Sequence, residues 1–256
     1  MEGVPAVSEE GKSTVRAVER ALDILLCFTS GTDLAMTEIA EQVGLHKSTV
    51  HRMLSTLEDR GFVERDSVSE RYRLGFRVWE LSAHLTSSDD PAVIWLPEME
   101  RLRNALGETV SLYVRDRGER IRIQAVQSSQ AVRRVATVGA RLPLYVGASS
   151  KVLIAFADEP DQEHIWRELE SLQPAVVNRY MFECQMTEIK RNGYATSIEE
   201  REPGAAAVSA PIFDRQGRLV AALSVSGPSS RLTLERMKDI APTVMETAGR
   251  MGTMAR

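Results

Sequence analysis

The feature that most restricts the fold of this chain is a narrow apolar seam that starts at residue 50 and repeats at helical spacing. The seam consists of Val50, Met53, Leu54 and Leu57. Positions i, i+3, i+4 and i+7 share one face of an α-helix, so the seam predicts a helix from about residue 46 to residue 60, with Gly61 at its end. The opposite arc is polar, which leaves that face to solvent or to a partner.

Shorter patterns surround this helix. A stripe of apolar residues predicts a first helix closed by Gly31, and a short second helix is expected from Thr37, as its N-cap, to Gly44. The turn at Gly44 needs a residue that tolerates positive φ. Residues 62–65 and 71–74 are expected to form a hairpin with a polar tip. The stripe of the first helix consists of Val15, Val18, Leu22, Leu25 and Leu26. Helix, turn, helix and hairpin is the order of a winged helix-turn-helix.

The outward face of the third helix holds groups that can meet DNA. Hydrogen-bonding and cationic side chains near the N-terminus of such a helix reach phosphates and base edges in the major groove. On the hairpin, two arginines two residues apart on one strand point to the same face, towards the flanking DNA backbone or the minor groove. The residues expected to bind double-stranded DNA are Lys47, Ser48, Thr49, His51, Arg52, Arg71 and Arg73.

Charge alone does not decide between DNA and other partners. The chain has a net charge of −4 at pH 7, which is not the footprint of a basic domain. From residue 46 to residue 77, seven Lys and Arg residues stand against five Asp and Glu residues. The alternative is a small three-helix domain with a solvated polar face. The short second helix, the glycine turn, the narrow seam and the basic hairpin together favour DNA binding.

The rest of the chain has a different pattern. We expect a disordered tail at 1–13, the winged domain at 14–76, a linker helix at 77–90 and a second domain at 91–256, because a Ser/Asp cluster and Pro91 mark the best boundary. Helices and hairpin-linked strands predict an α+β domain. Its expected helices are 91–106, 149–157, 160–172, 182–192 and a closing helix ending near 251; its expected strands are 110–114, 121–125, 133–139, 194–198, 206–213 and 219–226.

Several function classes are disfavoured. Cys27 and Cys184 are the only cysteines and lie far apart, which argues against a disulfide scaffold or a structural zinc site and suits a reducing cytoplasm. His84 and His164 have no partner at ligand spacing, so no metal is expected. No apolar run approaches the ~18 residues of a membrane span. We also expect no cofactor and no catalytic site.

Six stretches of this sequence resemble the IclR family of bacterial regulators. The resemblance rests on residues 15–25, 37–40, 44–54, 72–75, 141–145 and 221–228. It implies an all-α winged helix-turn-helix N-terminal domain followed by an α+β, GAF-like C-terminal effector-binding domain. It also implies a cytoplasmic regulator that forms homodimers or tetramers, binds operator DNA and responds to a small molecule, typically a carboxylate.

The resemblance places the effector on the concave side of the sheet. The residues it implies are Val135, Leu144, Ala148, Ser149, Ser197, Ala205, Ala207, Ser224 and Ser226. The sequence itself supports two features of this site. Ser224 and Ser226 alternate on one strand and so face the same way, and backbone N–H groups at Ala148 and Ser149, just before a helix, can hold an anion. The alternative interpretation is that these serines hydrogen-bond to backbone inside a buried strand.

Three positions depart from the family pattern. Ser197 stands where many members have an acid, Ala207 where many have a cysteine, and Ser150 where a glycine usually precedes the lysine of the pocket helix. Loss of a carboxylate and a thiol makes that side of the pocket less polar. We therefore expect an effector bulkier or more apolar than a very small keto acid, such as an aromatic acid or an amino-acid derivative.

Two other functions stay open. A GAF-like enzyme is disfavoured because the sequence has no nucleophile–base pair, and adjacent Glu199 and Glu200 point to opposite faces of a strand. A winged helix can also bind a protein instead of DNA. In the preferred interpretation, a dimer places two recognition helices in major grooves about one turn (~10 bp) or a multiple apart, and the linker helix transmits effector binding to the DNA-binding domain.

Overall fold

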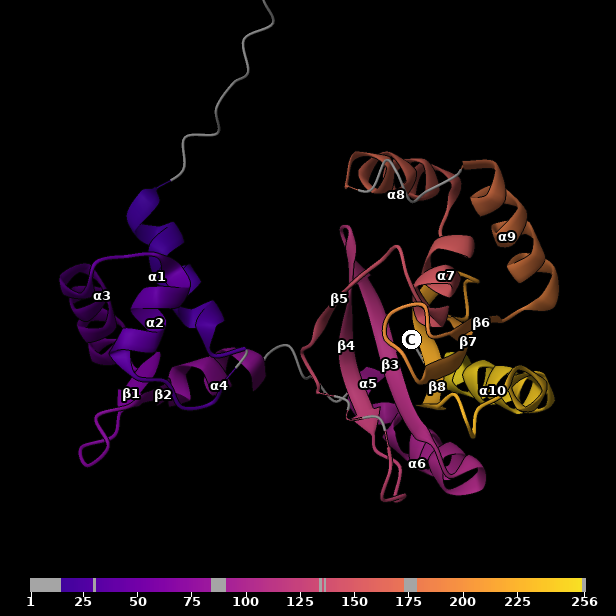
Figure 1. The fold of residues 1–256 in the computed structure, drawn as a ribbon, viewed down its shortest axis with the longest axis horizontal. Coiled ribbons are helices and arrows are strands. Elements are labelled where there is room, and N and C mark those ends of the chain that lie inside the picture. The colour runs from indigo at the N-terminus through magenta and orange to yellow at the C-terminus, as the bar shows by residue number, and fades with distance from the viewer. Residues whose placement is uncertain are drawn as a thin grey trace, which may run out of the picture. The chain divides into compact units, whose positions relative to one another are not determined.

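The computed structural model describes residues 15–29, 31–83, 91–133, 135, 137–172 and 179–254. The chain forms two compact units, Met1–Leu85 and Thr86–Arg256 (Figure 1). The division falls within the segment 77–90 that was expected to link two domains. The expected tail at 1–13, the Ser/Asp cluster and His84 lie outside the described residues.

The first unit is a three-helix domain with a two-stranded wing. Fully buried Ile24, Ile39 and Leu54 bring one side chain from each helix into a shared core. Gly44 has φ +63°, as the turn requires. Strands β1 and β2 pair antiparallel. The elements are α1 (Arg16–Cys27), α2 (Met36–Val43), α3 (Lys47–Asp59), β1 (Val63–Arg65), β2 (Tyr72–Leu74) and α4 (Phe76–Ala83).

Two helix ends differ from the sequence prediction. Helix α1 ends at Cys27 rather than near Gly31, because Phe28 turns into the core and is only 6% exposed. Helix α2 starts at Met36, so Thr37 is not its N-cap; Glu38 instead reaches back and accepts a hydrogen bond from the backbone N–H of Ala35 at 2.7 Å. A side chain inside the first turn thus replaces a hydroxyl cap.

The second unit is built on one six-stranded antiparallel sheet of order β5-β4-β3-β8-β7-β6. Helix α7 packs on one face, and α6 and α10 pack on the other (Figure 1). The strands are β3 (Thr109–Asp116), β4 (Glu119–Val126), β5 (Arg141–Pro143), β6 (Ala195–Ile198), β7 (Ala205–Phe213) and β8 (Leu219–Pro228). The helices are α5 (Pro91–Ile94), α6 (Leu96–Leu106), α7 (Ala148–Ala155), α8 (Glu159–Leu172), α9 (Arg179–Asn192) and α10 (Leu234–Met254).

The two faces of the sheet have different chemistry. On the α10 face, Leu112, Leu223 and Val225 belong to a large apolar core. On the α7 face, their strand neighbours Ser224 and Ser226 are hydroxyl residues beside a smaller apolar cluster. Alternation along β8 therefore separates a packed face from a polar one, as the sequence predicted.

Two further predictions were wrong. The strand expected at 133–139 is absent from the described residues of that segment, whose side chains are exposed. The segment contacts β4 through Arg122: Gly139 donates to its carbonyl at 2.7 Å, and its Nη1 donates to the carbonyl of Thr137 at 3.2 Å. The helix expected from 91 to 106 breaks at Trp95, because Pro97 lacks an N–H and disfavours helix just before it. Within the described residues, no helix combines the length and apolarity needed to cross a bilayer.

Candidate functional site

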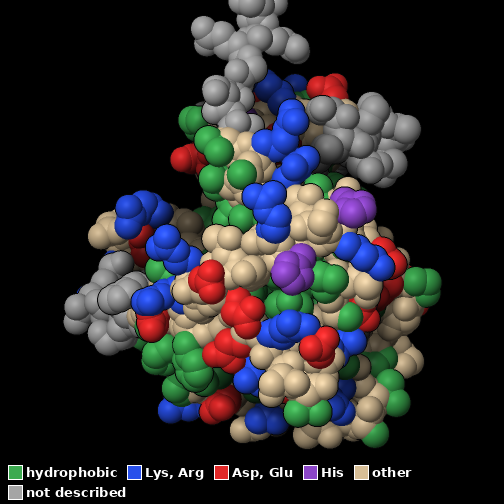
Figure 2. Space-filling view, turned by 90° about the vertical axis from the view of Figure 1, so that its left-hand side faces the viewer, with side chains coloured by type: hydrophobic (Ala, Val, Ile, Leu, Met, Phe, Trp, Pro, Cys, Tyr) green, Lys and Arg blue, Asp and Glu red, His purple; other side chains and the backbone are tan. Residues whose placement is uncertain are grey.

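Helix α3 presents an exposed polar surface at its N-terminal half. His46 caps the helix, and its Nδ1 accepts a hydrogen bond from the backbone N–H of Ser48 at 3.3 Å. Lys47, His51 and Arg52 are exposed, and no ion pair joins any of them to another described residue. In the face shown in Figure 2, Lys and Arg side chains lie beside His side chains with few acidic ones between them. Lys47 and Arg52 are therefore free to meet an anionic partner.

The wing also holds arginines, but each is paired with an acid. Arg73 donates to Glu64 through Nε at 3.1 Å and Nη2 at 3.0 Å. Arg71 lies just before β2 and donates from Nη2 to Glu38 at 2.7 Å and to the carbonyl of Asp33 at 2.8 Å. Arg71 therefore ties the wing to helix α2, while Arg73 stays on the wing surface.

The wing tip is ordered by one carboxylate. Asp66 Oδ1 accepts hydrogen bonds from the backbone N–H groups of Ser69 at 2.7 Å and Val68 at 3.0 Å. The bonds from the N–H and hydroxyl of Ser69, and that from Val68, lower the pKa of Asp66 below its ordinary value. The hairpin thus has a fixed tip without an apolar core of its own.

In the second unit, a cavity of about 60 Å³ lies between the α7 face of the sheet and the start of α7. Gly147 is the N-cap of α7 and has φ +96°, a conformation that favours glycine. Ala148 and Ser149 are the first residues of α7 rather than residues before it, and their N–H groups have no intrahelical acceptor. Seven of the nine expected effector residues line this cavity: Ala148, Ser149, Ser197, Ala205, Ala207, Ser224 and Ser226.

The other two expected residues lie elsewhere. Leu144 is fully buried in the apolar cluster beside the cavity, and Val135 is 69% exposed. The structure also addresses the alternative that the serines bond to backbone. Among the described residues, the hydroxyls of Ser224 and Ser226 have no hydrogen-bond partner. These hydroxyls are available to a ligand.

Sequence reasoning missed the charged residues of the cavity. The cavity wall also includes Tyr113, Arg120, Arg122, Glu200 and Arg201. Arg120 and Arg122 lie with their guanidinium carbons 5.5 and 5.2 Å from the centre of the Tyr113 ring. Burial lowers the pKa of Arg120 to about 10, and the nearby positive charges of Arg201 and Arg122 act in the same direction. Arg120 is nonetheless protonated at neutral pH.

The carboxylate of Glu200 already occupies part of the anion site. It accepts from the backbone N–H of Gly147 at 3.1 Å and from Lys151. Glu199 bonds to Ser229 at 2.9 Å and does not line the cavity. The expectation of a bulkier, partly apolar effector takes account of Ser197 and Ala207 but not of the two arginines. The cavity is small and positively charged.

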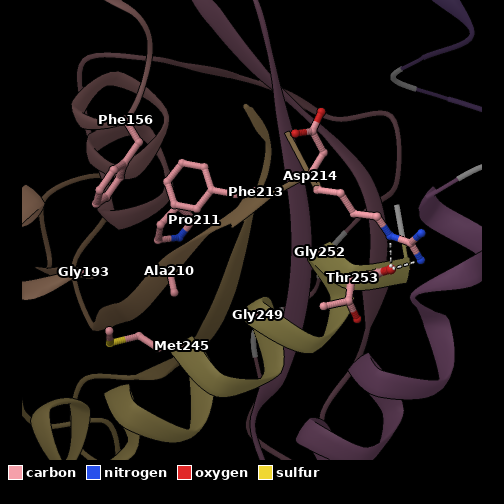
Figure 3. Close-up of a pocket in the computed structure, with 11 residues that line it drawn as sticks. Phe156, Gly193, Ala210, Pro211, Phe213, Asp214, Met245, Gly249, Gly252 and Thr253 are labelled. Carbon is pink, nitrogen blue, oxygen red and sulfur yellow. Dashed lines mark hydrogen bonds between the residues drawn. The ribbon is translucent and has the colours of Figure 1, made fainter. Parts of the chain in front are cut away.

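A second cavity, of about 410 Å³, lies at the other end of β7. Phe156 and Phe213 stand edge to face at 5.5 Å, and Met245 of α10 lies across from them (Figure 3). Arg215 donates to the carbonyl of Thr253 at 2.8 Å. This cavity is apolar and presents no buried polar group that lacks a partner among the described residues. Phe213 and Met245 are each 36% exposed, so it is a surface groove between sheet and helix rather than an enclosed site.

Comparison with known proteins identifies both units. Residues 17–67 match the sequence model of the IclR helix-turn-helix domain, and residues 84–252 match that of the bacterial transcriptional regulator IclR C-terminal domain. The chain belongs to the IclR family. The family consists of DNA-binding transcriptional regulators, and the expected fold class, a winged helix-turn-helix domain followed by an α+β domain, is confirmed.

Individual IclR-family relatives cover nearly the whole chain. The HTH-type transcriptional regulator XynR of Escherichia coli is 32% identical over 85% of this chain and 88% of its own length. The HTH-type transcriptional regulator KipR of Bacillus subtilis is 30% identical over 91% of this chain and 94% of its own. A crystal structure of an IclR regulator from Alicyclobacillus acidocaldarius superposes with a TM-score of 0.78 at 28% identity, over 95% of this chain and 100% of that one.

Proposed function

We propose that this chain is a homodimeric regulator that reads operator DNA with the N-terminal half of α3. The observation that supports this most directly is that Lys47, His51 and Arg52, on the outward face of a helix-turn-helix, are exposed and have no ion-pair partner among the described residues. Ser48 and Thr49 add hydroxyl groups that can donate to or accept from base edges. Phosphates and the DNA bases then take the place of water around these side chains.

In the same proposal, the two wing arginines have different roles. Arg73 lies on the surface of the wing and reaches the flanking DNA backbone once its pair with Glu64 opens. Arg71 positions the wing through Glu38 and Asp33 and contributes to DNA binding through that placement. All the residues first expected to contact DNA thus keep a role in DNA binding, although that of Arg71 is indirect.

The dimer is supported by the apolar stripe on α1. Val15, Val18, Leu22 and Leu26 are between 53% and 65% exposed, so this stripe faces away from the domain's own core. A contiguous exposed apolar surface on a small domain marks an interaction site. A second copy of the same helix covers it symmetrically, which places two α3 helices on one pseudo-palindromic operator.

The C-terminal domain is proposed to bind a small organic acid. A carboxylate of this acid accepts hydrogen bonds from the N–H groups at the start of α7, the positive end of the helix, and from the hydroxyls of Ser224 and Ser226. Among the described residues lining the cavity, Glu200 is the one carboxylate that could act as a base, and it is bonded to Lys151 and Gly147. We therefore propose binding without catalysis, in the cytoplasm, where operator DNA lies.

A selection from genomic DNA tests this function. Purified full-length protein is incubated with sheared DNA of the organism that encodes it, and bound fragments are sequenced. We expect one enriched motif with two half-sites in inverted repeat. The double variant Lys47→Ala/Arg52→Ala should enrich nothing, whereas Arg167→Ala, an exposed arginine paired with Glu163 on α8, should behave like the native chain. Equal enrichment by the double variant overturns the role of α3, and isolated half-sites overturn the dimer.

A further inference from the structure

The effector cavity holds more positive charge than its surroundings neutralise. Arg120 and Arg122 are 4% and 7% exposed. Among the described residues, the acceptors of their hydrogen bonds are carbonyl and hydroxyl oxygens, all neutral. The one carboxylate that lines the cavity, on Glu200, is already bonded to Lys151. Buried arginines are normally paired with an opposite charge, so the cavity lacks an anion.

Unpartnered polar atoms lie in the same region. The Nε–H of Arg120 is buried and has no acceptor among the described residues. The hydroxyls of Ser111 and Ser209 are buried without a partner as well, and both residues stand opposite Ser224 on the neighbouring strands. Native interiors leave few polar groups unsatisfied. Three of them beside one cavity indicate a polar ligand.

The two arginines stand at different places in the cavity. Arg120 lies at the start of α7, where it donates to the carbonyl of Val146 at 2.6 Å and to the hydroxyl of Ser150, and Arg122 lies beside Tyr113. Ser111 pairs with Ser224, and Tyr113, two residues further along β3, pairs with Arg122. Two residues of a strand span about 7 Å, and Arg122 lies one strand beyond β3. The carboxylate site at α7 and Ser224 is therefore separated from Arg122 by the length of a short carbon chain. Ser224, Tyr113 and both arginines line the same cavity.

We propose that the effector is a small organic dianion, a dicarboxylate of roughly four to six carbons, with one carboxylate at the start of α7, beside Arg120, and the other at Arg122. The inference rests on the proposed function and specifies its ligand. The cavity volume of about 60 Å³ has room for roughly four to six water molecules, which suits a compact molecule. A bulky aromatic acid requires the segment at Glu200 to move.

The competing explanation is that both arginines are structural. Arg120 holds the carbonyls of Pro143 and Val146 at 2.6 Å, and Arg122 holds the hydroxyl of Tyr113 at 2.7 Å. Those bonds account for the geometry of the side chains but not for their charge, since a neutral donor satisfies a carbonyl equally well. The experiment must separate a charge that binds ligand from one that supports a loop.

Matched pairs of acids make this separation. Succinate, glutarate and adipate are compared with butyrate, pentanoate and hexanoate by calorimetry on the full-length protein. We expect at least one dianion to bind tenfold more tightly than the monoanion of equal length. Arg122→Met should abolish that preference while its monoanion affinity stays within threefold. Arg141→Met, an exposed arginine paired with Asp116 and Glu119 outside the cavity, should leave it unchanged.

Thermal unfolding is measured for each variant alongside the titrations. If Arg122→Met does not fold, Arg122→Lys, which keeps the charge, replaces it. Arg122→Lys should retain part of the preference for dianions. Equal binding of dianions and monoanions, an unchanged preference in Arg122→Met, or no binding of any acid overturns the proposal. Operator binding without added acid is measured in parallel. Its loss overturns the proposed function, whereas intact operator binding with a response to monoanions alone overturns only the dianion.

Discussion

The two domains of this regulator hold their cations in opposite ways. Lys47 and Arg52 on α3 are exposed and have no acidic partner among the described residues. Arg120 and Arg122 in the effector domain are buried and bonded to neutral oxygens. An exposed cation keeps its hydration until a large polyanion displaces it, while a buried one has lost its water already. The first arrangement suits DNA, and the second suits one discrete small anion.

The wing provides a third arrangement that explains why net charge was a poor guide. Arg65, Arg71 and Arg73 are all in ion pairs, with Glu70, Glu38 and Glu64. These arginines enter the count of basic residues but are less available than those of α3. What matters for recognition is whether a cation has a partner in the folded chain, and a count of charges does not contain that information.

Salt concentration gives the largest expected difference between the two domains. Raising NaCl from 50 to 200 mM should weaken operator binding by about 10³-fold or more if six or more phosphates are contacted. Dicarboxylate binding should weaken by less than about tenfold, because buried charges are screened far less than exposed ones. Fluorescence anisotropy of labelled operator and calorimetry of the acid measure the two on one preparation. An equal salt dependence would mean that the arginines of the cavity are accessible to bulk ions.

Within the DNA-binding domain, the losses of operator affinity caused by Arg52→Ala and Arg73→Ala should differ by about tenfold. Arg52→Ala removes an unpaired cation from both copies of a dimer, so we expect roughly 10- to 100-fold weaker operator binding and a smaller salt slope. Arg73→Ala should cost less than about fivefold, since the side chain must first leave Glu64, and Glu64→Gln should strengthen binding by a similar small factor. Electrophoretic mobility shifts at several salt concentrations measure all three. A larger loss from Arg73→Ala than from Arg52→Ala contradicts the distinction.

The helix-turn-helix was predictable because its signals are local. The seam of α3 and the glycine turn lie within a few residues of one another, and Val50, Leu54 and Leu57 are buried as that spacing requires. The stripe of α1 was equally visible, but a stripe does not say what covers it. Ile24 and Cys27 face the core and Leu25 packs at its edge, whereas the other four residues of the stripe are exposed. A pattern of apolar residues cannot distinguish a core from a surface that another chain covers.

The arginines of the cavity were missed because alternation along a strand normally places the apolar residues inside and the charged ones outside. Along β4, Arg120 and Arg122 are buried while Ile121 and Ile123 are half-buried, the reverse of what hydrophobic alternation indicates. The serines of β8 followed the rule, because their apolar neighbours fill the larger core. Charge inside a ligand cavity violates the general pattern for a functional reason, so this part of the site needed the structure. The ion pair between Glu38 and Arg71 was equally out of reach, because it joins segments distant in sequence.

The ion pair between Glu38 and Arg71 gives the smallest of the three expected effects. Its removal tests the structural role assigned to Arg71. Next to it, Leu34 and Tyr72 exchange backbone hydrogen bonds of 2.9 and 2.8 Å that join the wing to the segment before α2. Arg71→Ala should destabilise this junction by about 1 kcal/mol, the upper range for a partly exposed pair, and so speed amide exchange at Leu34 and Tyr72 by roughly fivefold. Arg73→Ala is the matched control and should leave both amides unchanged.

Glu38→Gln sharpens this result. The glutamine can still accept from the N–H of Ala35 but loses its charge, so it should produce part of the effect of Arg71→Ala, and the double variant should add little to Arg71→Ala alone. Additive effects would show that Arg71 acts through the carbonyl of Asp33 instead, which its Nη2 also contacts at 2.8 Å. If exchange stays at the native rate in Arg71→Ala, Arg71 does not position the wing, and it belongs with Arg52 among the groups that contact DNA.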